Sequence, residues 1–429
     1  MKRCFLILTV LFLLFPRQLG ADNQFIVRLD SGLLGIQRIC IGLGCTVTRG
    51  LDGGLGQLFL VNVPTSIDPN AFLQLLQSQF GVSNVELDTV ITVPTTPIGR
   101  VIPSGLSDSR QVNYFGRTVW NGYANQPASQ VIGLNSARTT FNVFGSGIVG
   151  VIDTGIDANH PALQGVVVQG YDFTRNTPGI PSESSDLTQP VSPAVNGSAP
   201  ARVNDSTAAV LDQQSVIVLS QYAAFGHGTR VSGVIHLVAP NALIMPLKTF
   251  RTDGTGHLSD ILRAIYYGAQ NGAKILNMSF STPNYSKELG RALNTATANG
   301  VISVASAGND GQQVLVYPAA LGNVMGIAST DYLDQRSWFS NYGSSLVWVA
   351  APGEAIISTY PFNTYAASWG TSFSTPFVSG VAALLLDIRP DCSQKQAASA
   401  ISNARQLGPE LGYGRLDVYG AVLSLINSR

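Results

Sequence analysis

Hydrophobic and polar positions along the chain predict two folded units of different size. In the first unit, residues 24–29, 57–63 and 82–93 have strand-like patterns. A helix is predicted to begin after Asp68, because Asp is a favoured N-cap and the proline that follows it fits the first helical position. Residues 22–94 are therefore expected to fold as a small α+β domain.

The second unit alternates buried strand-like runs with helical stretches from about Asn121 onward. This alternation is typical of a parallel sheet that helices cover on both faces. The expected fold class is α/β: a doubly wound, mostly parallel sheet flanked by helices and preceded by the small α+β domain. The predicted strands are residues 147–152, 242–249, 274–279, 301–305 and 324–327, and the predicted helices include 258–269 and 285–299.

Two segments have the composition of connections between packed elements. We expect residues 95–120 to form a linker, because a stretch rich in Pro, Gly and Ser follows the small domain. Residues 121–429 would then form the larger domain. Within it, residues 174–220 are rich in Ser, Thr, Pro and Asn, which indicates a surface loop insertion.

The start of the chain has the features of a secretory signal peptide over residues 1–21. Two basic residues precede the uncharged run 4–15, and the small residues Gly20 and Ala21 offer a cleavage point. The alternative is a membrane anchor, but the run is shorter than the roughly 20 residues that span a bilayer. The sequence therefore predicts a secreted product, extracellular or periplasmic, that has no membrane attachment after cleavage.

Composition excludes several classes of protein. Hydrophobic residues make up 45% of the chain, charged residues 12%, and the formal net charge is zero, so neither a disordered polyelectrolyte nor a nucleic-acid-binding protein is expected. The cysteines are too few and scattered for a disulfide scaffold or a zinc site. After removal of residues 1–21, three cysteines remain. This number allows one pair, such as Cys40 with Cys45, and a free Cys392.

Two motifs place an acid and a base on the larger domain. Asp153 closes a predicted strand in the run Val-Ile-Asp-Thr-Gly, although Asp-Thr-Gly alone also occurs in aspartic proteases and in plain turns. His227 has glycine on both sides, and this arrangement permits the close approach of a partner. Taken alone, this motif fits an ordinary core or surface histidine better than a catalytic one.

Two further motifs lie at the ends of other elements. Asn309 follows the predicted strand 301–305 and could belong to a simple turn. Ser372 lies in the run Gly-Thr-Ser-Phe-Ser-Thr-Pro, which leads into an apolar helix. A serine in a first helical turn has backbone N–H groups and the positive end of the helix dipole beside it, although an N-cap serine would look similar.

Together, the four motifs resemble those of the subtilisin-like serine proteases, in the same order and with matching surroundings from about Pro127 onward. The resemblance implies a catalytic triad of Asp153, His227 and Ser372, with an oxyanion hole formed by Asn309 and the backbone of Ser372. It also implies that an extended peptide or protein substrate binds along two segments. The substrate-binding residues that this implies are Gly254, Gly256, Ser279, Phe280, Ser281 and Gly308.

The family resemblance gives the small domain a role as an inhibitory propeptide, so that the protein would be exported as a zymogen and act as a monomer. The chemistry would need no cofactor. The chain departs from the family in carrying Arg230 where most relatives have a second histidine. It also omits, after Ile235, the loop with which many subtilisins bind calcium, so whether a structural calcium ion binds stays open.

Two other functions fit parts of the pattern. One is a catalytically silent protein-binding relative, and the complete set of four motifs argues against it. The other is an esterase-type hydrolase that uses the same triad. The run around Ser372 lacks the Gly-x-Ser-x-Gly pattern of that class, because no glycine stands two places after the serine.

Overall fold

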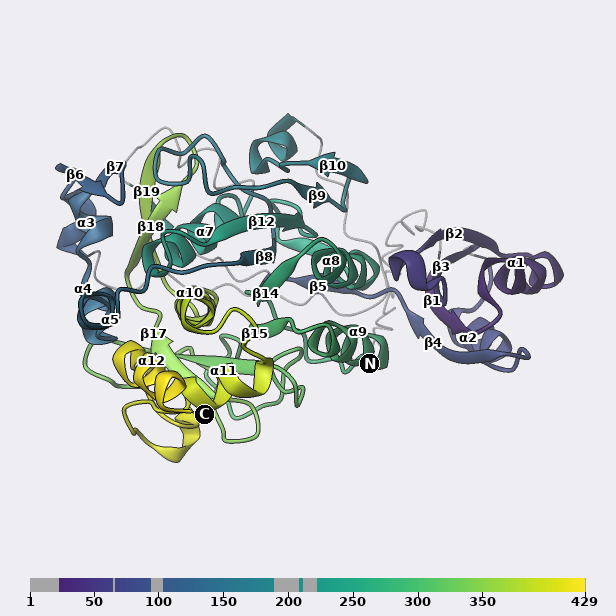
Figure 1. The fold of residues 1–429 in the computed structure, drawn as a ribbon. Coiled ribbons are helices and arrows are strands. Elements are labelled where there is room, and N and C mark those ends of the chain that lie inside the picture. The colour runs from purple at the N-terminus through teal and green to yellow at the C-terminus, as the bar shows by residue number, and fades with distance from the viewer. Residues whose placement is uncertain (1–22, 65, 94–102, 189–207, 211–221, 429) are drawn as a thin grey trace, which may run out of the picture.

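The structure is a computed structural model that describes residues 23–64, 66–93, 103–188, 208–210 and 222–428. The predicted signal peptide lies outside the described residues. The chain forms two parts: an N-terminal unit (residues 23–93) and a larger main body (residues 104–428), which lie side by side in Figure 1.

The N-terminal unit is a four-stranded antiparallel sheet with two helices. The helix predicted after Asp68 is present, and the Asp68 side chain accepts a hydrogen bond from the backbone N–H of Ala71 at 2.8 Å. In spatial order the strands are β2 (Thr46–Gly50), β3 (Leu58–Val63), β1 (Asn23–Leu29) and β4 (Val82–Leu87), and the helices are α1 (Gly32–Leu43) and α2 (Pro69–Gln77).

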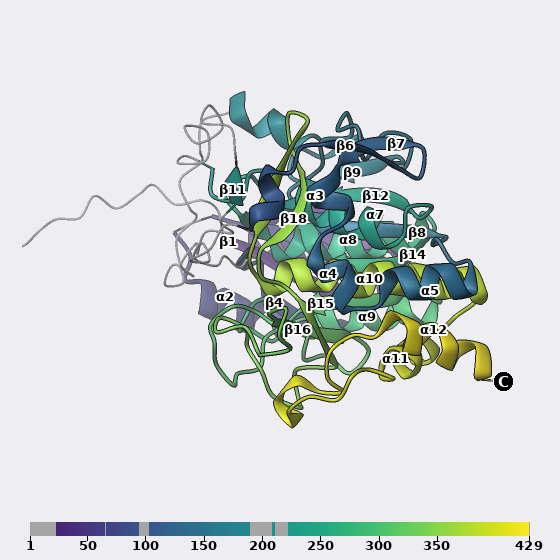
Figure 2. The ribbon, with the colours of Figure 1, turned by 90° about the vertical axis from the view of Figure 1, so that its left-hand side faces the viewer.

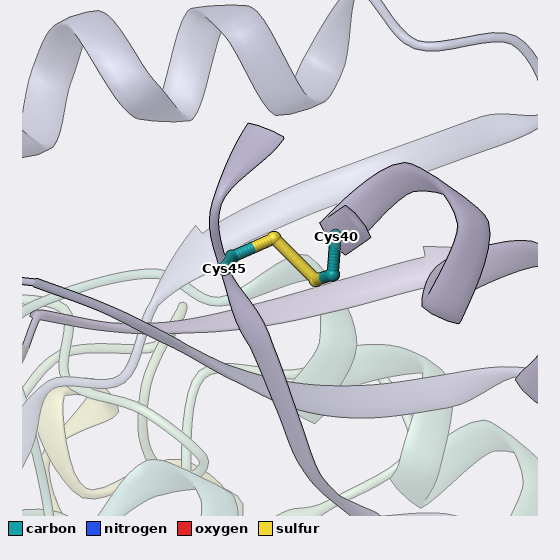
Figure 3. The surroundings of a disulfide bond; sticks show 2 residues. All are labelled: Cys40 and Cys45. Atoms are coloured by element: carbon teal, nitrogen blue, oxygen red, sulfur yellow. A yellow bond between two sulfur atoms is a disulfide. The ribbon is translucent and has the colours of Figure 1, made fainter. Parts of the chain in front are cut away.

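Cys40, near the end of α1, forms a disulfide with Cys45, just before β2, as the cysteine count allowed (Figure 3). Cys392 is free and buried. The disulfide closes a short loop, with Cα atoms 4.5 Å apart, and both cysteines lie in the core of the N-terminal unit. It therefore ties α1 to the edge strand of its own sheet.

Alternation along β1 divides its side chains between two cores. Phe25 and Val27 pack in the unit's own core, beneath its helices. Ile26, on the opposite face, joins a core shared with the main body, together with Leu58 and Leu60 of β3. The sheet of the N-terminal unit is therefore covered by α1 and α2 on one face and by the main body on the other.

The main body contains the predicted parallel sheet. It has eight strands, all neighbours being parallel except the antiparallel edge pair β9 and β10. In spatial order the strands are β10 (Thr177–Gly179), β9 (Gly170–Asp172), β12 (Leu243–Lys248), β8 (Ile148–Asp153), β14 (Ala273–Met278), β15 (Ile302–Ser306), β16 (Met325–Thr330) and β17 (Val349–Pro352).

Helices cover both faces of this sheet (Figure 2). The helices α8 (Leu258–Gln270) and α9 (Lys287–Ala298) lie between the sheet and the N-terminal unit, as Figure 1 shows. On the other face, α7 (His227–Val238) packs against α10 (Thr371–Ile388). Within the described residues, α10 has the length and apolar composition to cross a membrane, but 89% of it is buried inside the protein, as in a core helix.

Residues 103–120 are more ordered than a linker, and they pack against the main body. Leu106, Tyr114 and Val119 lie in its larger core, so the packed body begins before Asn121. The elements here are η2 (Ser104–Ser107), β6 (Gln111–Tyr114), β7 (Arg117–Trp120), α3 (Asn121–Ala124), α4 (Pro127–Val131) and α5 (Leu134–Phe141).

The predicted single strand over residues 82–93 was wrong, because the structure has two strands there in two different sheets. β4 ends at Leu87, and β5 (Val90–Thr92) pairs antiparallel with β13 (Thr255–His257) of the main body. The remaining elements are η1 (Gly53–Leu55), η3 (Glu183–Thr188), β11 (Ala208–Val210), β18 (Ile356–Tyr360), β19 (Thr364–Ser368), α11 (Gln394–Ile401), η4 (Pro409–Leu411) and α12 (Val418–Asn427).

Candidate active site

Asp153 and His227 meet at the carboxyl edge of the main sheet. Asp153 is the last residue of β8, and His227 is the first residue of α7. The Asp153 Oδ1 atom lies 2.7 Å from His227 Nδ1 and also accepts a hydrogen bond from the backbone N–H of Thr154 at 2.7 Å. Both side chains are buried, so the carboxylate holds the imidazole in one orientation away from bulk water.

The two glycines beside His227 are required by packing. Gly226 has a φ of 78°, and a Cβ atom there would lie 2.4 Å from the ring of Tyr360. A Cβ atom on Gly228 would lie 2.1 Å from the carbonyl oxygen of Gly155, which follows Asp153 by two residues. The start of α7 therefore reaches the end of β8 only because residue 228 has no side chain.

Ser372 lies in the first turn of α10, one residue after Thr371. Its Oγ donates a hydrogen bond to the carbonyl oxygen of Ser279 at 3.1 Å, and the Ser279 hydroxyl donates in return to the carbonyl of Ser372 at 2.9 Å. Among the described residues, His227 Nε2 is buried without a hydrogen-bond partner. A hydroxyl carries one proton, so Ser372 must leave the Ser279 carbonyl to donate to His227.

Asn309 lies beside the same helix terminus. Its Oδ1 atom accepts hydrogen bonds from the backbone N–H of Thr371 at 3.0 Å and from the Thr371 hydroxyl at 2.8 Å. These bonds fix the amide so that Nδ2 is the free end, and within the described part of the chain Nδ2 is buried without a partner. The first backbone N–H groups of a helix also lack partners inside the helix, and that of Ser372 is one of them.

The four residues that the motifs singled out therefore come together from the end of β8, the first turns of α7 and α10, and the loop after β15 (Ile302–Ser306). The His227 ring centroid lies 5.5 Å from that of Phe373, which connects the Asp153–His227 pair with the Ser372 turn. Asn309 contacts that same turn through Thr371. The cluster contains a carboxylate, an imidazole, a hydroxyl and an unpaired amide N–H, which together can perform acyl transfer.

Comparison with known proteins agrees with this geometry. The model of the subtilase family matches residues 145–420, a range that contains all four motifs. The chain belongs to the subtilase family. Relatives that it matches include serine proteinases.

Two curated relatives show how far the similarity extends. Thermitase of Thermoactinomyces vulgaris is 34% identical over 291 residues, which cover 65% of this subtilase and 89% of thermitase. A thermophilic serine proteinase of Bacillus sp. (strain AK1) is 35% identical over 281 residues, covering 64% of this chain but only 61% of that relative. The matched region thus spans less than two thirds of the Bacillus protein.

A solved structure has the same fold over nearly the whole chain. Fervidolysin from Fervidobacterium pennivorans, described as a keratinolytic enzyme related to subtilisin, aligns with a TM-score of 0.70 at 22% sequence identity. The alignment covers 94% of this subtilase and 61% of that chain. The predicted doubly wound fold is confirmed by this neighbour and by the parallel sheet.

Of the two segments expected to bind substrate, one pairs with the N-terminal unit and the other contacts Ser372. On one side, Gly254 and Gly256 belong to the stretch that pairs with β5 of the N-terminal unit, and Gly254 accepts a hydrogen bond from the Val93 N–H at 2.9 Å. On the other side, Ser279 contacts Ser372 as described. Strand pairing thus already occurs at the first of the two segments.

Of the remaining predicted substrate-binding residues, Phe280 points into the protein core, whereas Ser281 and Gly308 lie next to each other. The Phe280 side chain is fully buried in the core and packs against Phe250, with ring centroids 5.2 Å apart, so a contact with substrate would have to use its backbone. Ser281 and Gly308 are close neighbours, because a Cβ atom on Gly308 would lie 3.3 Å from Ser281 Oγ.

One site residue escaped the sequence analysis because it lies in the predicted loop insertion. Glu183, in η3, is buried, and it accepts hydrogen bonds from the hydroxyls of Thr154 and Thr229. Burial raises the pKa of Glu183 to about 7. The expectation of a surface loop over residues 174–220 is thus incorrect for η3. No periodicity marks Glu183, since its burial depends on partners far away in the sequence.

Proposed function

We propose that this subtilase is a secreted serine endopeptidase that is made as a zymogen and hydrolyses peptide bonds through an acyl-enzyme. The observation that carries the proposal is the 2.7 Å contact between Asp153 Oδ1 and His227 Nδ1, next to a serine at a helix N-terminus. This contact leaves Nε2 as the nitrogen available to a nucleophile. The family membership of the chain supports the same activity.

In the proposed mechanism, the Ser372 hydroxyl turns from the Ser279 carbonyl toward His227 Nε2. His227 takes the hydroxyl proton as Ser372 Oγ attacks the peptide carbonyl carbon, and then gives that proton to the leaving amine. Asp153 keeps the proton on Nδ1 and stabilises the imidazolium ion that forms. Water then repeats the sequence on the ester to release Ser372, so no cofactor is needed.

The negative charge that develops on the carbonyl oxygen would be held by Asn309 Nδ2 and the Ser372 backbone N–H. Two features support this role for Asn309. Its Oδ1 atom is occupied by Thr371, so the amide cannot rotate without losing two hydrogen bonds. Its Nδ2 atom, within the described residues, has no other partner to satisfy.

The N-terminal unit would act as an intramolecular inhibitor. Its strand β5 pairs antiparallel with Thr255–His257, at the segment where an extended substrate is expected. Two carboxylates of the unit also lie at helix N-termini of the main body: Glu86 accepts from the Ser286 hydroxyl at 2.6 Å before α9, and Asp88 accepts from the Ser259 N–H at 2.8 Å in α8. A cut within residues 95–120, followed by dissociation of the N-terminal unit, would open the Thr255–His257 segment to substrate.

Secretion rests on residues 1–21, which have the pattern of a signal peptide. We propose that the mature enzyme is extracellular or periplasmic, acts as a monomer on peptide and protein substrates, and binds no nucleic acid. A structural calcium ion is not part of this proposal. The described residues contain no group of three or more His, Cys, Asp or Glu side chains that could hold a metal ion.

The experiment that tests the proposal compares wild type with Ser372→Ala on casein and on a small ester, with and without a serine-directed inhibitor. We expect wild type to cleave casein, the inhibitor to stop it, and the variant to be inactive with its N-terminal unit uncut. Ester cleavage without casein cleavage would indicate an esterase. Folded wild type inactive on both substrates would indicate a silent binding relative.

A further inference from the structure

We propose that Glu183 is a positioning residue of the active site, which holds the Asp153 and His227 segments at a fixed separation. The proposal rests on the proposed function, because it concerns the efficiency of that same triad. It gives the segment after β10 a role: its η3 turn delivers a carboxylate into the interior beside the catalytic pair.

Glu183 joins the two chain segments that carry the acid and the base. Its Oε1 atom accepts from the Thr154 hydroxyl and from the Gly228 backbone N–H, the latter at 3.1 Å. Its Oε2 atom accepts from the Thr229 hydroxyl. Thr154 directly follows Asp153, and Gly228 and Thr229 directly follow His227. One side chain thus binds the end of β8 and the first turn of α7.

These bonds determine the direction of both hydroxyls. Thr154 Oγ1 donates to Glu183 and accepts from the Gly228 N–H at 3.0 Å, while Thr229 Oγ1 donates to Glu183 and accepts from the Asp157 N–H at 2.8 Å. Each hydroxyl has one proton, and the carboxylate is its acceptor in both cases. Without Glu183, the buried Thr229 hydroxyl would lose its acceptor, and the Thr154 hydroxyl would be left with Asp153 Oδ1 at 3.3 Å.

The η3 turn is held rigidly at a second point. Asp186, one turn later, accepts from Lys248 Nζ at 2.8 Å and from the Thr252 N–H at 2.9 Å, and it pairs with Arg175. Lys248 is fully buried at the end of β12. Glu183 therefore lies on a turn that is itself fixed by other contacts. Its carboxylate can for that reason hold the end of β8 and the start of α7 in place.

The charge of Glu183 depends on groups from every neighbouring element. Burial favours its protonated form, and so does the charge of Asp153 on β8, whereas the charge of Lys248 on β12 and the threonine hydrogen bonds favour the ionised form. Arg230 on α7 and Tyr360 on β18 also interact electrostatically with it, and Asp186 lies on the same turn. Protonation would turn one of its acceptor oxygens into a donor and break one of the three bonds.

The test uses Glu183→Ala and Glu183→Gln in the full chain, together with Asp186→Asn, which weakens the anchoring of the same turn but keeps the Glu183 carboxylate. Active-site titration with a serine-directed reagent gives kcat per folded enzyme, so a lower yield does not enter the comparison. For Glu183→Ala we expect kcat to fall about ten-fold or more with KM within two-fold, because small misplacements of catalytic groups cost up to about 10²-fold. The Gln variant should lose less, since its amide oxygen still accepts.

The pH profile separates positioning from general stability. If both His227 and Glu183 must lose a proton, log kcat/KM of wild type should fall toward acid with a slope above one. In Glu183→Gln the slope should be one. Asp186→Asn should lower Tm but keep the slope above one. An unchanged slope in Glu183→Gln, or a kcat for Glu183→Ala within two-fold of wild type, would overturn the proposal.

Failure of this inference differs from failure of the proposed function. Ser372→Ala is measured in the same series. If Ser372→Ala is inactive while the Glu183 variants match wild type, the triad stands and the positioning role falls. If Ser372→Ala retains activity, the proposed function itself is wrong. If Glu183→Ala does not fold, the slope and kcat of Glu183→Gln decide the question.

Discussion

Arg28 of the N-terminal unit forms an ion pair with Glu288 of the main body, with Nε 2.8 Å from Oε2. Glu288 lies in the first turn of α9, and its side chain is fully buried. Asn84 of the N-terminal unit donates to the same carboxylate at 3.0 Å. The contact between the two parts of the chain therefore has a charged centre as well as an apolar one.

The first prediction is that Arg28→Ala weakens this contact. Removing one partner of a buried, hydrogen-bonded charge pair across an interface costs about 2–5 kcal/mol. Glu288 keeps Asn84 and Arg291, so the low end of this range is expected. The lag before activity appears in the purified full chain should shorten about ten-fold or more. Arg38→Ala, an exposed position on α1, is the control and should leave the lag unchanged; equal lags in all three proteins would refute the prediction.

The second prediction concerns the oxyanion. Asn309→Ala removes the buried Nδ2 donor, and kcat should fall about 10²–10³-fold with little change in KM, a magnitude taken from subtilisin itself rather than from this structure. The measurement is steady-state kinetics on a peptide substrate after active-site titration. Loss confined to KM would mean that Asn309 binds the substrate without stabilising the transition state.

The third prediction is a pH dependence of stability due to His236. This side chain is fully buried in α7, and within the described residues both its ring nitrogens lack hydrogen-bond partners. Burial lowers its pKa to about 3, and the positive charges of Arg117 and Arg138 and of His160 act in the same direction. The unfolded chain binds the proton more tightly, since an unperturbed His has a pKa of about 6.5, so stability is lost as pH falls from about 6.5 toward 3.

Replacing His236 by Leu should remove this loss. The Tm difference, variant minus wild type, should be more positive at pH 4 than at pH 8. His160, whose pKa burial lowers to about 4, stays in both proteins, so its contribution cancels. Equal Tm differences at the two pH values would show that His236 does not contribute to acid sensitivity.

The fourth prediction concerns the residue before the scissile bond. Thr282 and Tyr317 exchange backbone hydrogen bonds of 2.8 Å, which brings the buried Val316 beside the segment that holds Ser281. We expect the side chains of Ser281, Thr282 and Val316 to narrow the pocket for this residue, and none of the three carries a charge. We therefore expect small or medium apolar residues to be preferred there, large aromatic residues to be cut less well, and acidic residues to be rejected.

A peptide library varied at that single position measures this preference. Val316→Ala should increase cleavage after Phe and Tyr. Each methylene group in an apolar pocket changes the discrimination between two substrates by about 1–3 kcal/mol. Leu315→Ala, at the half-exposed neighbouring position, is the control and should leave the profile unchanged. A dominant preference of wild type for Phe and Tyr, or for Asp and Glu, would contradict this description of the pocket.

Local patterns in the sequence predicted the main sheet well. The predicted strand 242–249 corresponds to β12, Leu243–Lys248, and the predicted helix 258–269 to α8, Leu258–Gln270. Runs of buried residues and cap residues are properties of neighbouring positions, so they can be recognised without a structure. The four motif residues were recognised as candidates by their places near the ends of such elements, and their predicted roles came from the resemblance to the subtilisin-like serine proteases.

What the sequence did not predict depends on distant contacts. An alternating pattern looks the same whether a strand pairs in one sheet or two, so the break between β4 and β5 could not be recognised. The helix α1 contains Gly35 and Gly42 and has no side-chain cap, which hides it from start and stop signals. The buried carboxylate of Glu183 is stabilised by hydrogen bonds from Thr154 and Thr229, which are remote from it in the sequence.

The most direct test of the central claim, that Ser372 is the nucleophile activated by His227, is mass spectrometry of the enzyme after reaction with an organophosphonate that modifies active-site serines. The account predicts one adduct, located on Ser372 by fragmentation, whose extent equals the loss of casein hydrolysis and which does not form in His227→Ala. Full inactivation without an adduct on Ser372, or retained hydrolysis with Ser372 modified, would contradict it.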